Sequence, residues 1–318
     1  MEGLVIKNTG SLYLVLPNGN VAETPVPCKV KGNFRLRGIR TTNPVAVGDR
    51  VTFSEPAPGA LEGYITAVTP RRNYIIRRAS NLSKESHIIA ANIDEAFLIV
   101  TLAHPTTSTT FIDRFLATAE AYAVPATLVI NKTDLLTDDD DRELLEALMY
   151  LYRSIGYNVL AISAETGDGL DALRQRLSGK ISLLSGNSGV GKSTIINDLI
   201  PGLDLRTAEV SAVHDSGMHT TTFSEMFALP GMPDTWIIDT PGVRGFGTID
   251  FDRYQTAHYF PEIFRVSKGC RFDNCTHTHE PGCAVREALE NSEIAQSRYA
   301  SYLSILEDID PDKYRKPF

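Results

Sequence analysis

The chain has 318 residues, and its 42% hydrophobic and 22% charged content is that of a folded globular protein, which excludes a largely disordered one. It contains no run of 18 apolar residues and no basic-then-apolar signal pattern at its N-terminus, so we expect a cytoplasmic protein with reduced thiols and no membrane contact. The length predicts two or three domains. In the absence of a long heptad repeat or a large apolar stripe, we expect a monomer.

The formal net charge of −8 argues by itself against a nucleic-acid partner, but the charge is unevenly distributed. Residues 1–80 carry 11 Lys or Arg against 5 Asp or Glu, whereas the remainder carries 20 against 34. This asymmetry indicates one basic face on an otherwise acidic protein, with ordinary solvated surface charge as the alternative.

Residues 1–70 contain five short strand-like runs, separated by turn signals such as Asn18-Gly19, Gly48-Asp49 and Pro58-Gly59. Five strands in this length predict a small barrel of the oligonucleotide-binding (OB) type, with an SH3-like barrel as the alternative. Cys28 stands alone in this region, and we expect it to be a small core residue.

Residues 71–92 form a predicted basic linker with Arg71-Arg72 and Arg77-Arg78 on either side of Tyr74. Such a segment could lie along phosphates and stack on an unpaired base. It could equally be a partly buried β-extension whose arginines reach out to solvent.

Residues 93–248 alternate strands with helices, which predicts a parallel α/β sheet. A buried-strand pattern, Ala126 to Ile130, leads into the motif Asn131, Lys132, Thr133, Asp134, at the strand end where nucleotide sites lie. The Asp134 carboxylate can accept two hydrogen bonds from guanine, and adenine cannot donate this pair of bonds. We expect Asn131 to brace the phosphate loop and the Lys132 stem to lie along the base.

The next strand leads into Ser163 and Ala164, where a backbone N–H could meet the guanine O6. After it comes a complete match to the phosphate-loop motif, with a strand before it and a helix-compatible stretch behind it. Its glycines let backbone N–H groups surround phosphate oxygens at a helix N-terminus. The predicted phosphate-binding residues are Gly186, Asn187, Ser188, Gly189, Val190, Gly191, Lys192, Ser193 and Thr194.

A third strand ends in Asp239, which can hold a Mg²⁺-bound water, and Gly242 follows with an N–H suited to a γ-phosphate. We expect Ser193 and Thr221, or Thr220 in its place, to complete the Mg²⁺ ligands. The sequence therefore predicts a GTP site. Its base-reading motif precedes the phosphate loop, the reverse of the usual order, which indicates a circularly permuted P-loop GTPase domain.

Residues 249–318 form a predicted zinc-binding helical domain. Cys270, Cys275, His277 and Cys283 can surround one Zn²⁺ tetrahedrally, and such a closed ligand set is typical of a structural ion. His279 is the alternative histidine ligand. A disulfide is a competing interpretation, but it would leave an odd thiol and would not use the histidine.

The permuted motif order, the phosphate loop Gly-Asn-Ser-Gly-Val-Gly-Lys-Ser, the runs Gly-Met-His-Thr-Thr-Thr and Asp-Thr-Pro-Gly-Val-Arg, and Cys-x₄-Cys-x-His-x₅-Cys together closely resemble the bacterial RsgA (YjeQ/YloQ) family. The resemblance covers essentially the whole chain. It implies a GTPase that binds the small ribosomal subunit late in maturation, is stimulated by it, and touches ribosomal RNA (rRNA) with its OB and zinc domains.

Many GTPases orient the attacking water with a residue just after the Asp-x-x-Gly element, but this chain has the apolar Val243 there. We therefore expect slow intrinsic hydrolysis, with Lys192 and Thr221 as catalytic groups. His219 is the candidate for positioning water, and His214 is the second choice. The alternative function is a GTP-gated RNA-binding scaffold in which hydrolysis only times release.

Overall fold

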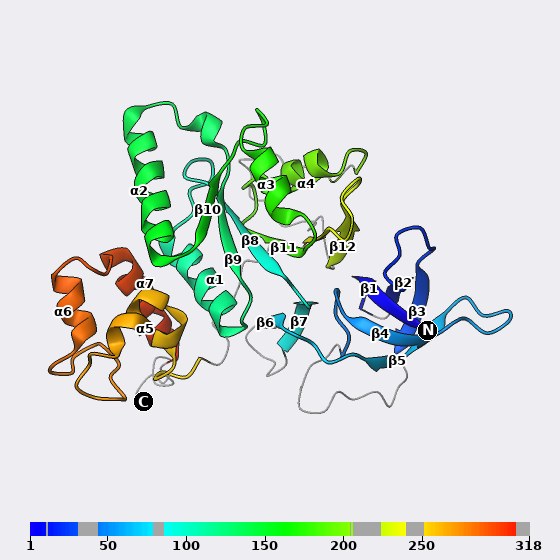
Figure 1. Cartoon of the computed structure of the whole chain (residues 1–318), viewed down its shortest axis with the longest axis horizontal. Coiled ribbons are helices and arrows are strands. Elements are labelled where there is room, and N and C mark those ends of the chain that lie inside the picture. The colour runs from blue at the N-terminus through cyan, green and yellow to red at the C-terminus, as the bar shows by residue number, and fades with distance from the viewer. Residues whose placement is uncertain are drawn as a thin grey trace, which may run out of the picture.

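The computed structural model describes residues 1–10, 12–30, 44–78, 86–203, 205, 224–239 and 251–309. A β-barrel and a group of C-terminal helices lie at opposite ends of a central α/β domain (Figure 1). No helix within the described ranges is long and apolar enough to cross a membrane.

The N-terminal barrel has five strands in the order β1-β2-β3-β5-β4, closed by pairing of β1 with β4. β3 and β5 run parallel and the other pairs are antiparallel. This closed arrangement confirms the expected OB-type barrel. Cys28 is fully buried in its core beside Phe53 and Ile65, as expected. The strands are β1 (Glu2–Asn8), β2 (Tyr13–Pro17), β3 (Val26–Val30), β4 (Arg50–Ser54) and β5 (Gly63–Val68).

Part of the positive charge of this region is paired with carboxylates of the same chain. Four of its basic side chains are paired with carboxylates at 2.5–2.9 Å, namely Lys7 with Glu225, Lys29 with Glu62, Arg71 with Asp49 and Arg72 with Asp94. The basic residues between positions 31 and 43 lie outside the described part of the chain. Only Glu225 and Asp94 come from outside residues 1–80, so these two partners lower the excess positive charge of the region, whereas Glu62 and Asp49 are already included in its residue count.

The segment predicted as a basic linker contains an antiparallel hairpin of β6 (Tyr74–Arg78) and β7 (Ser86–Ala91). Tyr74 packs against Tyr122 of the α/β domain, with ring centroids 5.5 Å apart. The buried Arg71 guanidinium donates to both Asp49 carboxylate oxygens at 2.7 Å. The hairpin is thus fixed to its neighbours on both sides.

The α/β domain is built on the strand order β10-β9-β8-β11-β13-β12, in which only β12 is antiparallel to its neighbour. β8 is buried along its whole length, because helices cover both faces of the sheet. The strands are β8 (Glu95–Val100), β9 (Ala126–Ile130), β10 (Asn158–Ala161), β11 (Ile181–Ser185), β12 (Glu225–Ala228) and β13 (Trp236–Asp239). The helices are α1 (Thr109–Ala121), α2 (Asp139–Ile155), α3 (Leu170–Leu177) and α4 (Lys192–Leu199).

The C-terminal domain packs around Phe260, Ile263, Tyr302 and Ile305. Its elements are η2 (Thr256–Tyr259), α5 (Pro261–Ser267), α6 (Ala284–Glu290) and α7 (Gln296–Ile309). α7 lies along α1 of the α/β domain (Figure 1). The two domains therefore share an interface made largely by these two helices.

A buried ion cluster joins the two domains at this interface. Arg298 of α7 donates to Asp113 of α1 at 2.7 Å and to both carboxylate oxygens of Glu262 at 2.7 and 3.1 Å. Tyr152 of α2 donates to the same Asp113 oxygen at 2.7 Å. Since Arg298 is 1% exposed, it is the charge that allows two carboxylates to remain buried here.

We predict that Arg298→Met destabilises the C-terminal domain by about 3–5 kcal/mol, because the substitution leaves two buried carboxylates without a counter-charge. The matched control is Arg114→Met, which removes a partly exposed pair with Asp308 and two hydrogen bonds to Ser304 at the same helix interface and should cost less, about 1–2 kcal/mol. Urea unfolding of both variants measures the difference. Equal losses would contradict the dominance of the buried cluster.

Candidate functional site

The phosphate loop joins β11 to α4, as its motif predicts. Burial lowers the pKa of the Lys192 ammonium, while the nearby Asp239 carboxylate opposes that shift. The ammonium donates to the carbonyls of Gly186 and Asn187 at 2.7 and 2.9 Å. A side chain at position 186 would begin 2.3 Å from the Ile99 carbonyl oxygen, so only glycine lets the loop pass over β8. The loop is thus tightly packed against the sheet around its lysine.

Asn131 connects the base-reading motif to the phosphate loop. Its side-chain amide donates to the Val190 carbonyl at 2.8 Å and accepts from the Ala164 N–H at 3.0 Å. The expected brace is therefore present. Gly191 has a φ of +94°, and a Cβ there would lie 2.3 Å from the Asn131 amide nitrogen. The brace needs glycine at this position.

The other residues of the base-reading motif lie close to the same edge of the sheet. Lys132 adopts a left-handed conformation with φ 63° and donates to the His104 carbonyl at 2.5 Å. The Thr133 hydroxyl donates at 3.0 Å to the carbonyl of the residue that follows β10. The Ser163 hydroxyl donates to the Asp134 carboxylate at 2.6 Å. That bond fixes the orientation of the carboxylate.

Two of these contacts were not foreseen from the sequence. We expected Ser163 to act through its backbone, but its side chain also orients Asp134. A serine directly after a strand was the available signal. The sequence gives no signal for the contact of Lys132 with His104, because this contact depends on the path of the loop after β8.

The predicted Mg²⁺ residues are only partly described. Asp239 ends β13 and is 8% exposed, and Ser193 is the second residue of helix α4. A carboxylate and a hydroxyl are the hard oxygen donors that suit Mg²⁺. Thr221, Gly242 and His219, with the alternatives Thr220 and His214, lie outside the described residues.

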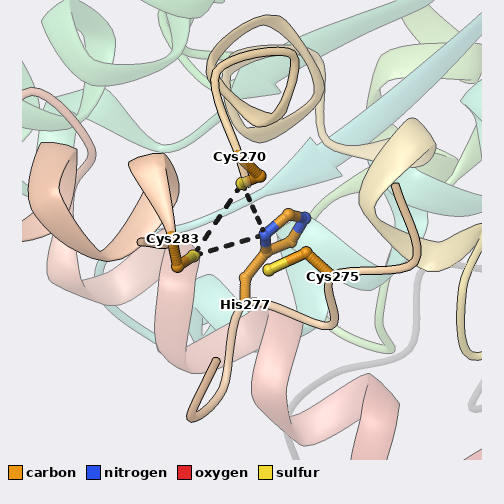
Figure 2. Close-up of side chains that lie close together, drawn as sticks. All are labelled: Cys270, Cys275, His277 and Cys283. Carbon is orange, nitrogen blue, oxygen red and sulfur yellow. Dashed lines mark hydrogen bonds between the residues drawn. The ribbon is translucent and has the colours of Figure 1, made fainter. Parts of the chain in front are cut away.

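The cysteine and histidine side chains of the C-terminal domain converge on one point (Figure 2). The ligand atoms of Cys270, Cys275, His277 and Cys283 all lie within 4.8 Å of one another. The Cys270 and Cys283 sulfurs are 4.0 Å apart, and each is 3.5 Å from His277 Nδ1. Tetrahedral Zn²⁺ with bonds of about 2.0–2.3 Å would place its ligands about 3.5–3.8 Å apart, so the cluster fits this ion.

His279 does not take part in the cluster. Its Nδ1 lies 2.8 Å from the Thr278 hydroxyl. The loop is held by Glu280, whose carboxylate accepts from the backbone N–H groups of Thr276, Thr278 and His279 at 2.7–3.2 Å. These bonds order the loop that carries His277.

Helix α7 also holds the loop that carries His277. Tyr299 donates to the His277 carbonyl at 2.6 Å, and Tyr302 donates to the Thr276 carbonyl at 2.8 Å. The sequence suggested only that these tyrosines pack, because their position in the helix does not show which carbonyls they reach.

We predict that the purified protein holds one Zn²⁺ and that His277→Ala loses it, whereas His279→Ala retains it. Without the ion, the loop loses the bonds that hold its three cysteines and its histidine together, and the C-terminal domain should unfold at lower temperature. Metal analysis and thermal unfolding of both variants test this. Loss of zinc from the His279 variant alone would contradict the ligand assignment.

We predict that Gly191→Ala weakens nucleotide binding roughly tenfold or more, because the new methyl group displaces the buried Asn131 amide from its hydrogen bonds. Gly179→Ala is the matched control, since Gly179 also has a positive φ of 69° but has open space around its Cβ position. Titration with a fluorescent GTP analogue compares them. Equal affinities in both variants would show that the brace is dispensable.

Two family models match the chain, namely the RsgA N-terminal domain over residues 2–65 and the RsgA GTPase over residues 68–249. The "Small ribosomal subunit biogenesis GTPase RsgA" of Bacteroides fragilis (strain YCH46) is 57% identical over 319 residues, and the protein of the same name from Porphyromonas gingivalis (strain ATCC 33277) is 58% identical. Both matches cover 100% of each chain.

Two solved structures are also similar. YjeQ from Thermotoga maritima is 33% identical, with a TM-score of 0.76 and coverage of 99% of each chain. YloQ, described as a circularly permuted GTPase, is 28% identical, with a TM-score of 0.72 and coverage of 99% of this chain and 96% of YloQ. The chain therefore belongs to the RsgA family of circularly permuted GTPases.

Proposed function

We propose that this GTPase acts in assembly of the small ribosomal subunit and hydrolyses GTP when bound to it. The observation that carries the proposal is the identity of 57–58% over the full chain to proteins named for small ribosomal subunit biogenesis. The proposal places the protein in the cytoplasm as a monomer.

In this proposal Asp134 reads the base by accepting two hydrogen bonds from guanine. Its bond from Ser163 supports this role, because it holds the carboxylate in one orientation before nucleotide binds. Asn131 joins the base-reading and phosphate-binding halves. Lys192 exchanges its two carbonyl partners for β- and γ-phosphate oxygens, which bear full negative charge.

Mg²⁺, when bound, neutralises charge on the β- and γ-phosphates. We assign Ser193 and Thr221 to direct contact with the ion and Asp239 to contact through water, and Gly242 to the γ-phosphate. His219 is the proposed water-positioning residue. The apolar Val243 supports slow hydrolysis in the free protein, because it cannot orient a water molecule itself.

The proposed units are the barrel over residues 1–70, the linker over 71–92, the GTPase domain over 93–248 and the zinc domain over 249–318. We propose that the barrel and the zinc domain contact rRNA. Their placement at opposite ends of the GTPase domain supports this, because two separated contacts can fix the orientation of a protein on a large surface (Figure 1).

We predict that purified small ribosomal subunits raise GTP turnover at least about tenfold, because the apolar Val243 cannot orient water and binding of the subunit positions His219 to do so. Turnover is measured with saturating GTP, with and without subunits. Large subunits at the same concentration are the control. An unchanged rate with small subunits would contradict the proposal.

The same assay tests His219. In His219→Ala, stimulated turnover should fall while GTP affinity, measured separately, stays at the wild-type value. Full stimulation of this variant would reassign water positioning to another group and leave the GTPase proposal intact.

A further inference from the structure

Three charged residues lie side by side on three adjacent strands. Lys7 of β1 pairs directly with Glu225 of β12, and Glu225 pairs directly with Asp239 of β13. Residues paired in this way project to the same face of a sheet, with Cβ atoms about 4.5–5.5 Å apart. The row begins in the barrel and ends at the residue assigned to the Mg²⁺ water.

Lys7, which comes from the barrel, supplies the positive charge of this row. Glu225 and Asp239 are like charges on directly opposite positions, an arrangement that destabilises a sheet. The Lys7 ammonium lies 2.9 Å from both carboxylate oxygens of Glu225 and neutralises it. On the other side, Asp239 is close enough to the Lys192 ammonium to influence it electrostatically.

This contact is also where the barrel sheet joins the GTPase sheet, since among the described residues β1 and β12 are paired at this position alone. Lys7 and Glu225 are about one-third exposed, so as an isolated pair they would contribute little to stability. Asp239 is 8% exposed, and water screens its interaction with Glu225 less than it screens a fully exposed pair. The Lys7–Glu225 pair therefore matters because it lies beside Asp239, and not because it stabilises the fold.

We propose that the Glu225 carboxylate adds negative potential beside Asp239, that Lys7 of the barrel offsets it, and that this pair thereby sets how strongly the nucleotide site binds Mg²⁺. The inference rests on the proposed role of Asp239. Removing the positive charge of Lys7 leaves an extra negative charge beside the ion and strengthens its binding. Removing the negative charge of Glu225 leaves Lys7 without its counter-charge, and the unpaired positive charge weakens Mg²⁺ binding.

The experiment measures release of a fluorescent GDP analogue from the full-length protein as a function of free Mg²⁺ concentration. We expect Glu225→Gln to need about two- to fivefold more Mg²⁺ than wild type for half-maximal retention, and Lys7→Met about two- to fivefold less. The double variant should return close to wild type. High salt should shrink both shifts, because it screens the charges.

A purely structural role of the pair predicts a different pattern. Both single variants break the same contact between β1 and β12, so a loosened sheet would shift them in the same direction, which would overturn the inference. Lys29→Met, which breaks the Lys29–Glu62 pair elsewhere in the barrel, is the control and should match wild type.

Failure of the inference and failure of the proposed site are distinguishable. If wild type retains the analogue in a Mg²⁺-dependent way but both variants match it, only the role of Lys7 and Glu225 is wrong. If retention by wild type does not depend on Mg²⁺, the proposed ion site itself is wrong, and the inference is overturned with it.

Discussion

The side chain of Asn131 is the contact that joins the predicted base-reading motif to the phosphate loop. One buried amide donates to the phosphate loop and accepts from the loop after β10, so it fixes three motifs in one arrangement. A carboxylate could not donate to Val190, and an apolar residue would leave both backbone partners unsatisfied. The order of the motifs along the chain does not matter to this contact. It requires only that β10, β9, β8 and β11 are neighbours, which the permuted sheet provides.

The zinc loop is linked to the GTPase domain through one helix. Tyr299 and Tyr302 of α7 hold the loop, while Arg298 of the same helix is buried against Asp113 of α1. In the sequence, the C-terminal domain is also the next described part of the chain after β13, which ends at Asp239. The C-terminal domain is therefore attached to the GTPase domain both by the chain and by a buried ion cluster.

The sequence predicted the features that depend on local spacing. The phosphate loop, Asn131 to Asp134 and the cysteine cluster were all recognisable, because parallel strands bring their carboxyl ends to one edge and a metal needs ligands at short intervals. Contacts between distant elements were not predictable. Lys7 and Glu225 are 218 residues apart, and their pairing depends on the register between two domains. Charge counting likewise could not show that four basic residues of the first 80 are paired internally.

The most direct test of the guanine site between Asp134 and Lys192 is a competition titration of the wild-type protein. A bound fluorescent GTP analogue is displaced with unlabelled GTP and, separately, with ATP. A site built on two hydrogen bonds to the Asp134 carboxylate should require about 10³-fold or more ATP than GTP, since the wrong base leaves that carboxylate unpaired. Displacement by ATP at the same concentration as GTP would contradict this account.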